Sequence, residues 1–278
     1  MVSLHRSQPL PTSSELPCSD DTPVDNEDQN FLPNYLLFLL ERLWGDRQDW
    51  FFGVDMAIYH TTGVSPKVPV VPDAFLSLGV PRRKPANRSR RSYVLWEEGG
   101  IVPLWVLEMV SWTPGGEYEE KLALYQTLGV QYYTIYNPEF WQRDRHQPLE
   151  IYQLIRGEYQ LQLGEPFWMA EVGLALGRSR GVIGGIEREV LAWFDQGGDR
   201  YLSAAEEADQ ERRARLDAVQ SLDQERRARL DAVQSLDQER RARLDAVQSL
   251  HQLGLSEIQI ANTLGLTVAI VRGELAGD

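Results

Sequence analysis

The stretch LWVLEMVSWTPGGEYEEKLALYQTLGVQYYTIYNPE, residues 104–139, has the pattern of a strand, a helix and a second strand. Apolar side chains dominate residues 104–110, which predicts a buried strand. Residues 117–130 have helical spacing and end near Gly129, a residue typical of a helix C-terminus. Residues 130–137 are rich in tyrosine and precede a proline, which predicts the second strand.

One face of the first strand carries four side chains, because successive side chains of a strand alternate: Leu104, Val106, Glu108 and Val110. A carboxylate on such an apolar face is costly unless a metal ion, a lysine or several donors compensate it. Asp73 ends another apolar run, and Lys121 lies on the predicted helix. Two acids and a lysine on consecutive elements suit metal-assisted phosphodiester hydrolysis. The alternative is that Asp73 caps a turn and Glu108 pairs with an arginine.

Further elements on both sides of this stretch extend the domain to about residues 31–195. They are a helix at 35–44, strands within 49–60 and 67–75, two strands around Gly99–Gly100 within 93–111, and a hairpin at 148–162. Alternation of strands and helices predicts an α/β or α+β domain.

Six motifs in this region resemble the Uma2 family, also called DUF820, which is common in cyanobacteria. They are PDAFLSLGVPRR (72–83), RRSYVLWEEGG (90–100), E-x-x-S from Glu108, K-x-x-x-Y from Lys121, LGVxYY (128–133) with YNPE (136–139), and IYQLIRGEY (151–159). The resemblance covers about residues 31–165, and the motifs occur in the family's order.

This resemblance implies a restriction-endonuclease-like PD-(D/E)XK core, with a mixed central sheet flanked by helices. It implies a DNA endonuclease in which Asp73 and Glu108 bind Mg²⁺ or Mn²⁺ and Lys121 completes the catalytic set. The usual lysine of this fold lies two residues after the second acid, where this chain has Val110; Uma2 members are thought to supply it from the following helix. Glu41 is a weaker candidate for an additional outer acid.

A basic cluster lies between the two acids and predicts a loop that grips phosphate, with a solvated loop as the alternative. Its members are Arg82, Arg83, Lys84, Arg88, Arg90 and Arg91. Glu97 and Glu98 follow it. Adjacent strand residues point to opposite faces, so we expect these two acids to be solvated at a hairpin edge rather than to share an ion.

The segments outside the domain differ from it in composition. Residues 1–30 are acidic and rich in Pro and Ser, which predicts disorder. Residues 196–250 form a predicted helical spacer, in which DQERRARLDAVQSL occurs three times without change, at 209–222, 223–236 and 237–250. With Leu216 at heptad position a, alternate heptads lack an apolar seam, which indicates a spacer helix or a weakly pairing rod. Residues 251–278 resemble the helix-turn-helix tail of DNA-binding proteins, and the alternative is a helical hairpin that only packs or oligomerises.

The composition limits the classes of function that this chain can have. The net charge of −13 argues against a protein that coats nucleic acid, yet allows an enzyme with a local basic patch. The single cysteine, Cys18, and the scattered His5, His60, His146 and His251 argue against a Cys- or His-built metal site. The start of the chain lacks a signal peptide, and the longest apolar run is far too short to cross a membrane. We therefore predict a cytoplasmic protein.

Two functions remain open from the sequence. The first is the Mg²⁺-dependent DNA endonuclease, with DNA as partner and no membrane. The second is a catalytically inactive nuclease-fold protein with a coiled-coil spacer, acting as an interaction or DNA-associated regulatory protein. A homodimer through the nuclease domain or the repeat helix is compatible with both.

Overall fold

The computed structural model describes residues 9–17, 26–113 and 115–277. His5 and Cys18 lie outside these residues. The chain divides into two compact units, the first ending at Glu206 and the second beginning at Glu207. Across the described residues, no helix has the length and apolar character needed to cross a membrane.

A six-stranded mixed sheet organises the first unit, in the order β1-β3-β5-β6-β7-β8. Its strands are β1 (Trp50–Val54), β3 (Ala74–Leu78), β5 (Trp105–Met109), β6 (Tyr132–Tyr136), β7 (Leu149–Ile155) and β8 (Glu158–Leu161). Only β5 and β6 of these neighbours are parallel. Parallel strands need a crossover connection, and helix α2 (Glu120–Leu128) supplies it. The predicted mixed α/β architecture is confirmed.

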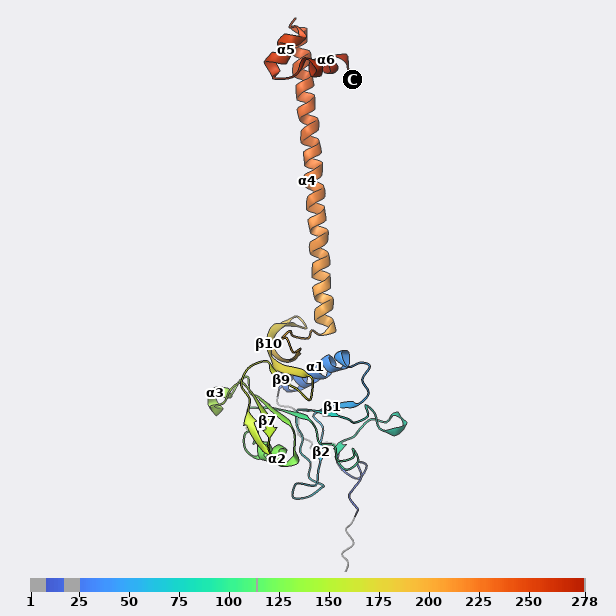
Figure 1. The fold of residues 1–278 in the computed structure, drawn as a ribbon, viewed down its shortest axis with the longest axis vertical. Coiled ribbons are helices and arrows are strands. Elements are labelled where there is room, and N and C mark those ends of the chain that lie inside the picture. Colours follow the sequence, from blue (N-terminus) through green and yellow to red (C-terminus); the bar gives the residue numbers. More distant parts are fainter. Residues whose placement is uncertain (1–8, 18–25, 114, 278) are drawn as a thin grey trace, which may run out of the picture. The chain divides into compact units, whose positions relative to one another are not determined.

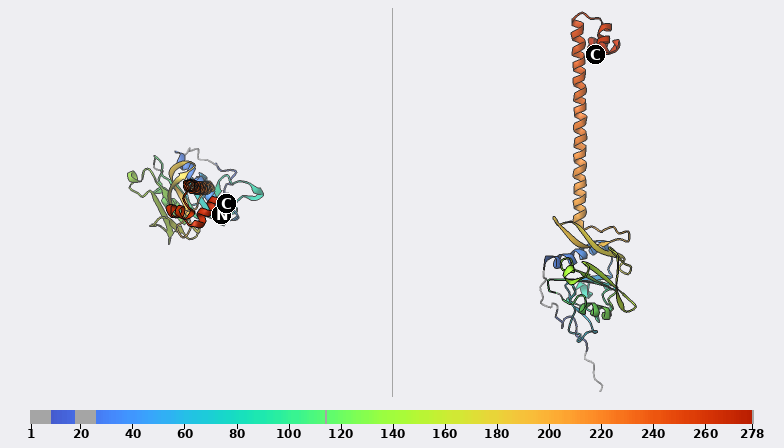
Figure 2. Two further views of the ribbon diagram at one scale, coloured as in Figure 1. Left: turned by 90° about the horizontal axis from the view of Figure 1, so that it is seen from above. Right: turned by 90° about the vertical axis from the view of Figure 1, so that its left-hand side faces the viewer.

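The two faces of this sheet bury separate cores. One face packs against α1 (Glu27–Leu43) and a three-stranded sheet of β9 (Phe167–Met169), β10 (Leu174–Ile183) and β11 (Ile186–Phe194). The other face packs against α2. Figure 1 shows α1 with β9 and β10 on one side and α2 on the other, and Figure 2 shows the same layers from a second direction. The sheet is therefore covered on both faces.

The face that carries Glu108 is the one that α2 covers. Val106 and Val110 belong to its core, as the alternation predicted. Leu104 was predicted on the same face, but it precedes β5 and packs against the opposite core. Leu104, just before β5, thus departs from the alternation, whereas Val110, just after β5, keeps it.

Two predicted strands begin or end elsewhere than expected. The predicted strand within 49–60 divides into β1 and the short β2 (Ile58–Tyr59), because Asp55 between them has a positive φ of 47°. The strand predicted within 67–75 begins only after Asp73. Pro69 and Pro72 have no N–H to donate to a neighbouring strand, so regular pairing starts at Ala74. The hairpin of β7 and β8 is confirmed, as is the helix end at Gly129, where φ is 88°.

The remaining short elements of the first unit connect these strands. They are β4 (Tyr93–Val94), which pairs in parallel with β2, the 3-10 turn η1 (Pro85–Asn87) and helix α3 (Trp141–Asp144). A second strand was expected immediately before Gly99–Gly100, but β4 ends at Val94 and the glycines lie in turns with φ of 68° and 79°.

Part of the N-terminal stretch predicted to be disordered is packed against the domain. Leu16 is buried, and the Trp96 indole N–H donates to the Pro11 carbonyl at 2.9 Å. Helix α1 already begins at Glu27, where Asn26 accepts from two backbone N–H groups. For residues 9–17 and 26–30 the prediction of disorder is therefore wrong, since specific side-chain contacts hold residues 9–17, and Asn26 caps α1, which packs against the sheet. The rest of that prediction lies outside the described residues.

The first unit extends past the predicted limit at residue 195. Arg200 forms an ion pair of 2.6 Å with Glu206, and the Tyr35 hydroxyl of α1 donates to Glu206 at 2.9 Å. These contacts connect the start of α4 (Ala204–Gln252) to α1.

The second unit consists of most of α4 with α5 (Glu257–Leu264) and α6 (Val268–Ala276). Ser256 and Gln259 form the capping box that starts α5. Gly265 ends α5 with φ of 66°, because a left-handed residue suits a helix C-terminus. Val247 of α4 packs with Ile260, Ala261 and Val271 in a small core.

We predict that Gly53→Ala destabilises the first unit by about 1–3 kcal/mol. Gly53 lies opposite Phe75 in the β1–β3 register, and a Cβ there would overlap the buried Phe75 ring. Gly181→Ala in β10 is the control, because no atom lies within 4 Å of its added Cβ. Urea unfolding measures both, and equal losses would contradict the steric explanation.

Candidate functional site

Strand register brings the two predicted acids together. Ala74, the first residue of β3, lies opposite Leu107 of β5, so Asp73 just before β3 comes beside Glu108, which follows Leu107. The Asp73 carboxylate accepts the backbone N–H of Met109 at 2.6 Å. This hydrogen bond fixes Asp73 beside the residue that follows Glu108.

Helix α2 brings the lysine to the same place. Lys121 Nζ lies 2.7 Å from Glu108 Oε2, and the Tyr125 hydroxyl, one turn further along α2, donates to Glu108 Oε1 at 2.7 Å. The Glu108 carboxylate is 1% exposed. The predicted alternative, a Glu108–arginine pair, does not occur; the partner is the predicted lysine. Asp73, Glu108 and Lys121 therefore converge, although their roles in catalysis stay a proposal.

Burial first and like charge second raise the pKa values of the two acids. Desolvation and the neighbouring Glu108 carboxylate raise the pKa of Asp73 to about 8, against its ordinary 3.8. Desolvation also raises the pKa of Glu108, although Lys121 and Tyr125 oppose this effect. Desolvation lowers the pKa of Lys121, but the Glu108 carboxylate outweighs it, so the pKa is raised. Lys121 is therefore held as an ammonium ion.

A further acid adds to this negative charge. Glu117 is 4% exposed, and both its carboxylate oxygens accept the Gly115 N–H. Its charge raises the pKa of both Glu108 and Lys121. The Tyr133 hydroxyl donates to the Glu117 carbonyl at 2.7 Å, which connects this segment to β6. Lys121 thus lies near three acids, Asp73, Glu108 and Glu117.

The residues fit a hard divalent cation bound in part by water. Within residues 9–17, 26–113 and 115–277, no three His, Cys, Asp or Glu side chains are gathered closely enough to hold a metal by themselves. Mg²⁺, however, usually keeps several waters and takes one or two carboxylates. Burial first and the Glu108 carboxylate second raise the pKa of Asp73, and a bound cation would favour its ionised form. Asp73 and Glu108 would hold such a cation.

Comparison with known proteins gives the family. Residues 22–182 match Uma2, described as "Putative restriction endonuclease". The chain belongs to the Uma2 family. Comparison with curated protein sequences gives no match.

A solved Uma2-type structure is also similar to this chain. It is the crystal structure of "a putative nuclease belonging to DUF820 from Anabaena variabilis". The two chains are 12% identical, with a TM-score of 0.37 over 52% of this chain and 71% of that one.

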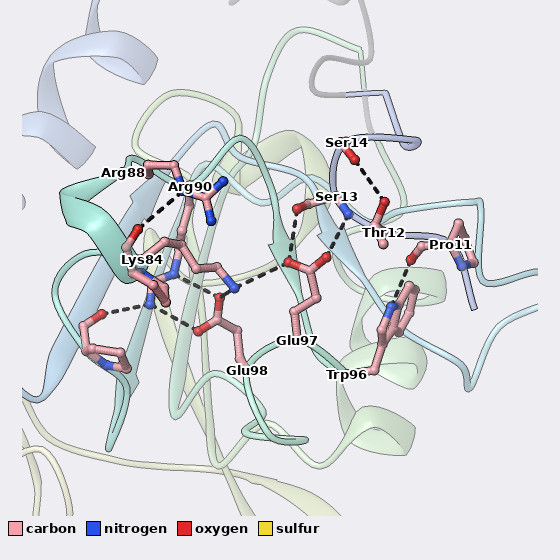
Figure 3. A network of polar contacts seen from close by, with 12 residues as sticks. Pro11, Thr12, Ser13, Ser14, Lys84, Arg88, Arg90, Trp96, Glu97 and Glu98 are labelled. Atoms are coloured by element: carbon pink, nitrogen blue, oxygen red, sulfur yellow. Dashed lines mark hydrogen bonds and ion pairs between the residues drawn. The ribbon is translucent and has the colours of Figure 1, made fainter. Parts of the chain in front are cut away.

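The basic cluster of this Uma2 chain is partly used for internal contacts. Arg90 is buried and binds Glu98 through two N–H groups at 3.0 Å each, while Lys84 Nζ lies 2.6 Å from Glu98 (Figure 3). Arg82 pairs with Glu41 at 3.2 Å and lies over the Trp50 ring. Arg82 and Lys84 are half-buried and Arg90 is buried, which does not support the prediction that these three side chains bind phosphate. Arg83, Arg88 and Arg91 remain exposed.

The two acids after the cluster are not solvated as a pair. Glu98 is 6% exposed, and Glu97 accepts from the backbone and hydroxyl of Ser13 (Figure 3). The prediction of two solvated acids is wrong for Glu98, because the turn directs it toward Arg90 and Lys84. Glu41 forms an ion pair with Arg82.

Three contributors to the site had no role assigned from the sequence. They are the Tyr125 hydroxyl, the Met109 backbone N–H and the Glu117 carboxylate. Tyr125 had a usable signal, since it lies four residues after Lys121 and such residues share a helix face. The Met109 contact had none, because it depends on strand register.

Asp73→Asn should stabilise the metal-free protein increasingly as pH rises. Between about pH 4 and pH 8 the folded state retains a proton on Asp73 that the unfolded state releases, so this group's contribution to stability declines with pH. The gain of Asp73→Asn should grow from near zero at pH 4 to on the order of 1–3 kcal/mol at pH 8.

Urea unfolding in EDTA at several pH values measures this gain. Asp49→Asn is the control, because Asp49 is exposed and hydrogen bonding from Arg47 lowers its pKa. A gain for Asp73→Asn that is the same at pH 5 and pH 8 would show that the Asp73 pKa is ordinary.

Arg90→Ala should cost the domain about 3–5 kcal/mol, because it leaves Glu98 buried without its main partner. Arg88→Ala, in the same loop, removes an exposed side chain whose Nε donates to the Pro85 carbonyl, and should change stability little. Thermal unfolding of both variants decides whether the cluster is mainly structural. Similar melting temperatures for the two would contradict a structural role for Arg90.

Proposed function

We propose that this Uma2 protein is a divalent-metal-dependent endonuclease that hydrolyses phosphodiester bonds of DNA. The convergence of Asp73, Glu108 and Lys121 at a buried, electronegative point carries the proposal. Membership of a family described as "Putative restriction endonuclease" supports it. Asp73 and Glu108 are the proposed metal ligands, with Mg²⁺ or Mn²⁺ as the ion.

Each side chain has a separate part in the proposed reaction. A bound divalent cation supplies Lewis-acid stabilisation of the negative charge that develops on the phosphate. Lys121 supplies a fixed positive charge toward the same phosphate; because its pKa is raised, it is unsuited to act as the base. Tyr125 is a positioning residue that holds the Glu108 carboxylate.

The exposed arginines of the basic cluster are the proposed contacts to the DNA backbone. Arg83, Arg88 and Arg91 are exposed, and guanidinium groups bind phosphate through paired N–H donors. The overall negative charge of the chain implies that such binding is local and sensitive to salt.

A second function is favoured by one observation. Both oxygens of Glu108 already accept hydrogen bonds, from Lys121 and Tyr125. A carboxylate with both oxygens bonded in this way also suits a nuclease fold that is catalytically inactive and serves as an interaction or regulatory protein. Only activity distinguishes the two.

Plasmid cleavage in Mg²⁺ or Mn²⁺ tests the proposal. We expect Asp73→Asn, Glu108→Gln and Lys121→Met each to lower the rate by roughly 10²-fold or more. The controls are Lys67→Met, which removes an exposed lysine, and Glu150→Gln, which alters another buried acid of the sheet. Cleavage that survives Asp73→Asn would remove Asp73 from the mechanism. No metal-dependent cleavage of any nucleic acid by the wild type would favour the inactive alternative.

Stability separates catalytic from structural effects at Lys121. Lys121→Met leaves the buried Glu108 carboxylate without its counter-ion and should cost stability. The double variant Lys121→Met/Glu108→Gln removes both charges, so its melting temperature should recover while cleavage stays lost. Recovery of cleavage together with stability would exclude both Lys121 and Glu108 from the mechanism.

A further inference from the structure

Three identical repeats of α4 have different surroundings. In the third repeat, residues 237–250, Val247 is fully buried beneath α5 and α6, and Leu250 packs against the same core. The corresponding side chains of the first two repeats are 51–66% exposed: Leu216, Val219, Leu222, Leu230, Val233 and Leu236. The apolar side chains that form a core in the third repeat are thus uncovered in the first two repeats.

These uncovered side chains are arranged for a helical partner. Leu216 and Val219 occupy heptad positions a and d, and Leu230 and Val233 occupy the same positions fourteen residues later. The intervening a and d positions are Asp223 and Arg226. The seam of 216–233 is therefore apolar at both ends and charged in the middle.

The charged middle selects the direction of the partner. In a parallel pair in register, Asp223 faces a second Asp223 and Arg226 faces a second Arg226, and like charges repel. Reversal of one helix sets position a opposite position d. Asp223 then faces Arg226 of the other helix, Leu216 faces Val233, and every layer of the seam is complementary.

We infer that residues 209–236 of α4 form an antiparallel coiled coil with a second copy of this chain. The two-fold axis passes between residues 224 and 225, because each residue of the seam meets its complement about that point. A self-complementary surface of this kind is what a two-fold homodimer requires. The inference is independent of the proposed nuclease activity.

The third repeat shows that these apolar side chains can pack against other helices. There Val247 and Leu250 of the same pattern pack against apolar side chains of α5 and α6, and Arg243 pairs with Glu274 of α6 at 2.6 Å. The first two repeats offer the same chemistry. Since α5 and α6 cover only the third copy, a second chain is the occupant that matches both the apolar ends and the charged centre.

Deletion of residues 209–236 from the full chain tests the interface. This deletion removes both uncovered repeats and restores an unaltered sequence at the junction, with α5 and α6 still next to their own repeat. Analytical ultracentrifugation should show dimers of the wild type that increase with concentration, and a monomer for the deletion at the same concentrations. A monomeric wild type, or a deletion that still dimerises, would overturn the inference.

Cysteine cross-linking tests the direction. Two chains, one with Leu216→Cys and one with Val233→Cys, both in a Cys18→Ser background, are mixed and mildly oxidised. The antiparallel pair predicts the mixed 216–233 disulfide in roughly tenfold or greater excess over either self-disulfide. Predominant 216–216 and 233–233 products would indicate a parallel pair and contradict the inference.

Charge reversal tests the central layer. Asp223→Arg sets two arginines opposite each other and should weaken dimerisation by roughly tenfold or more. The double variant Asp223→Arg/Arg226→Asp restores opposite charges and should restore the dimer. Glu225→Arg makes the same change of charge outside the seam and is the matched control. A double variant that remains as weak as the single one, or a control equally weakened, would contradict the assigned register.

Discussion

The buried Glu108 carboxylate is the constraint on which the first unit depends. It lies on an apolar strand face beneath a helix, where an isolated charge would be very costly. Lys121 and Tyr125, one turn apart on α2, satisfy it from the helix side. The crossover that makes β5 and β6 parallel is also what places α2 over this face. Topology and charge compensation therefore depend on one strand–helix contact.

The first unit contains a second buried acid, Glu98, whose charge is compensated in a different way. Glu98 is satisfied by a buried arginine and a lysine from the preceding loop, which leaves little excess negative charge there. Around Glu108 the acids outnumber the cations, and the charge of Glu108 adds to the larger effect of burial in raising the pKa of Asp73. This contrast in charge balance marks the Asp73 site as the one that gains from an added cation.

The repeats illustrate that burial is a property of surroundings and not of sequence. Valine at the same repeat position is uncovered at 219 and 233 and fully buried at 247. The difference arises because α5 and α6 follow the third copy directly along the chain. Identical segments can thus serve as core in one place and as an interaction surface in another.

The strand–helix–strand order of residues 104–137, the end of α2 at Gly129, the β7–β8 hairpin and the candidacy of Asp73, Glu108 and Lys121 could all be predicted from the sequence, because periodicity, turn residues and family motifs are local. The three-stranded sheet of β9, β10 and β11 was not predicted. Tertiary structure alone decided three other matters: the hydrogen bond from Met109 to Asp73, the burial of Arg90 with Glu98, and the packing of residues 9–17. Each joins residues from separate elements through strand register or loop path. Such pairings depend on the whole packed chain, whereas periodicity and turn signals act over a few residues.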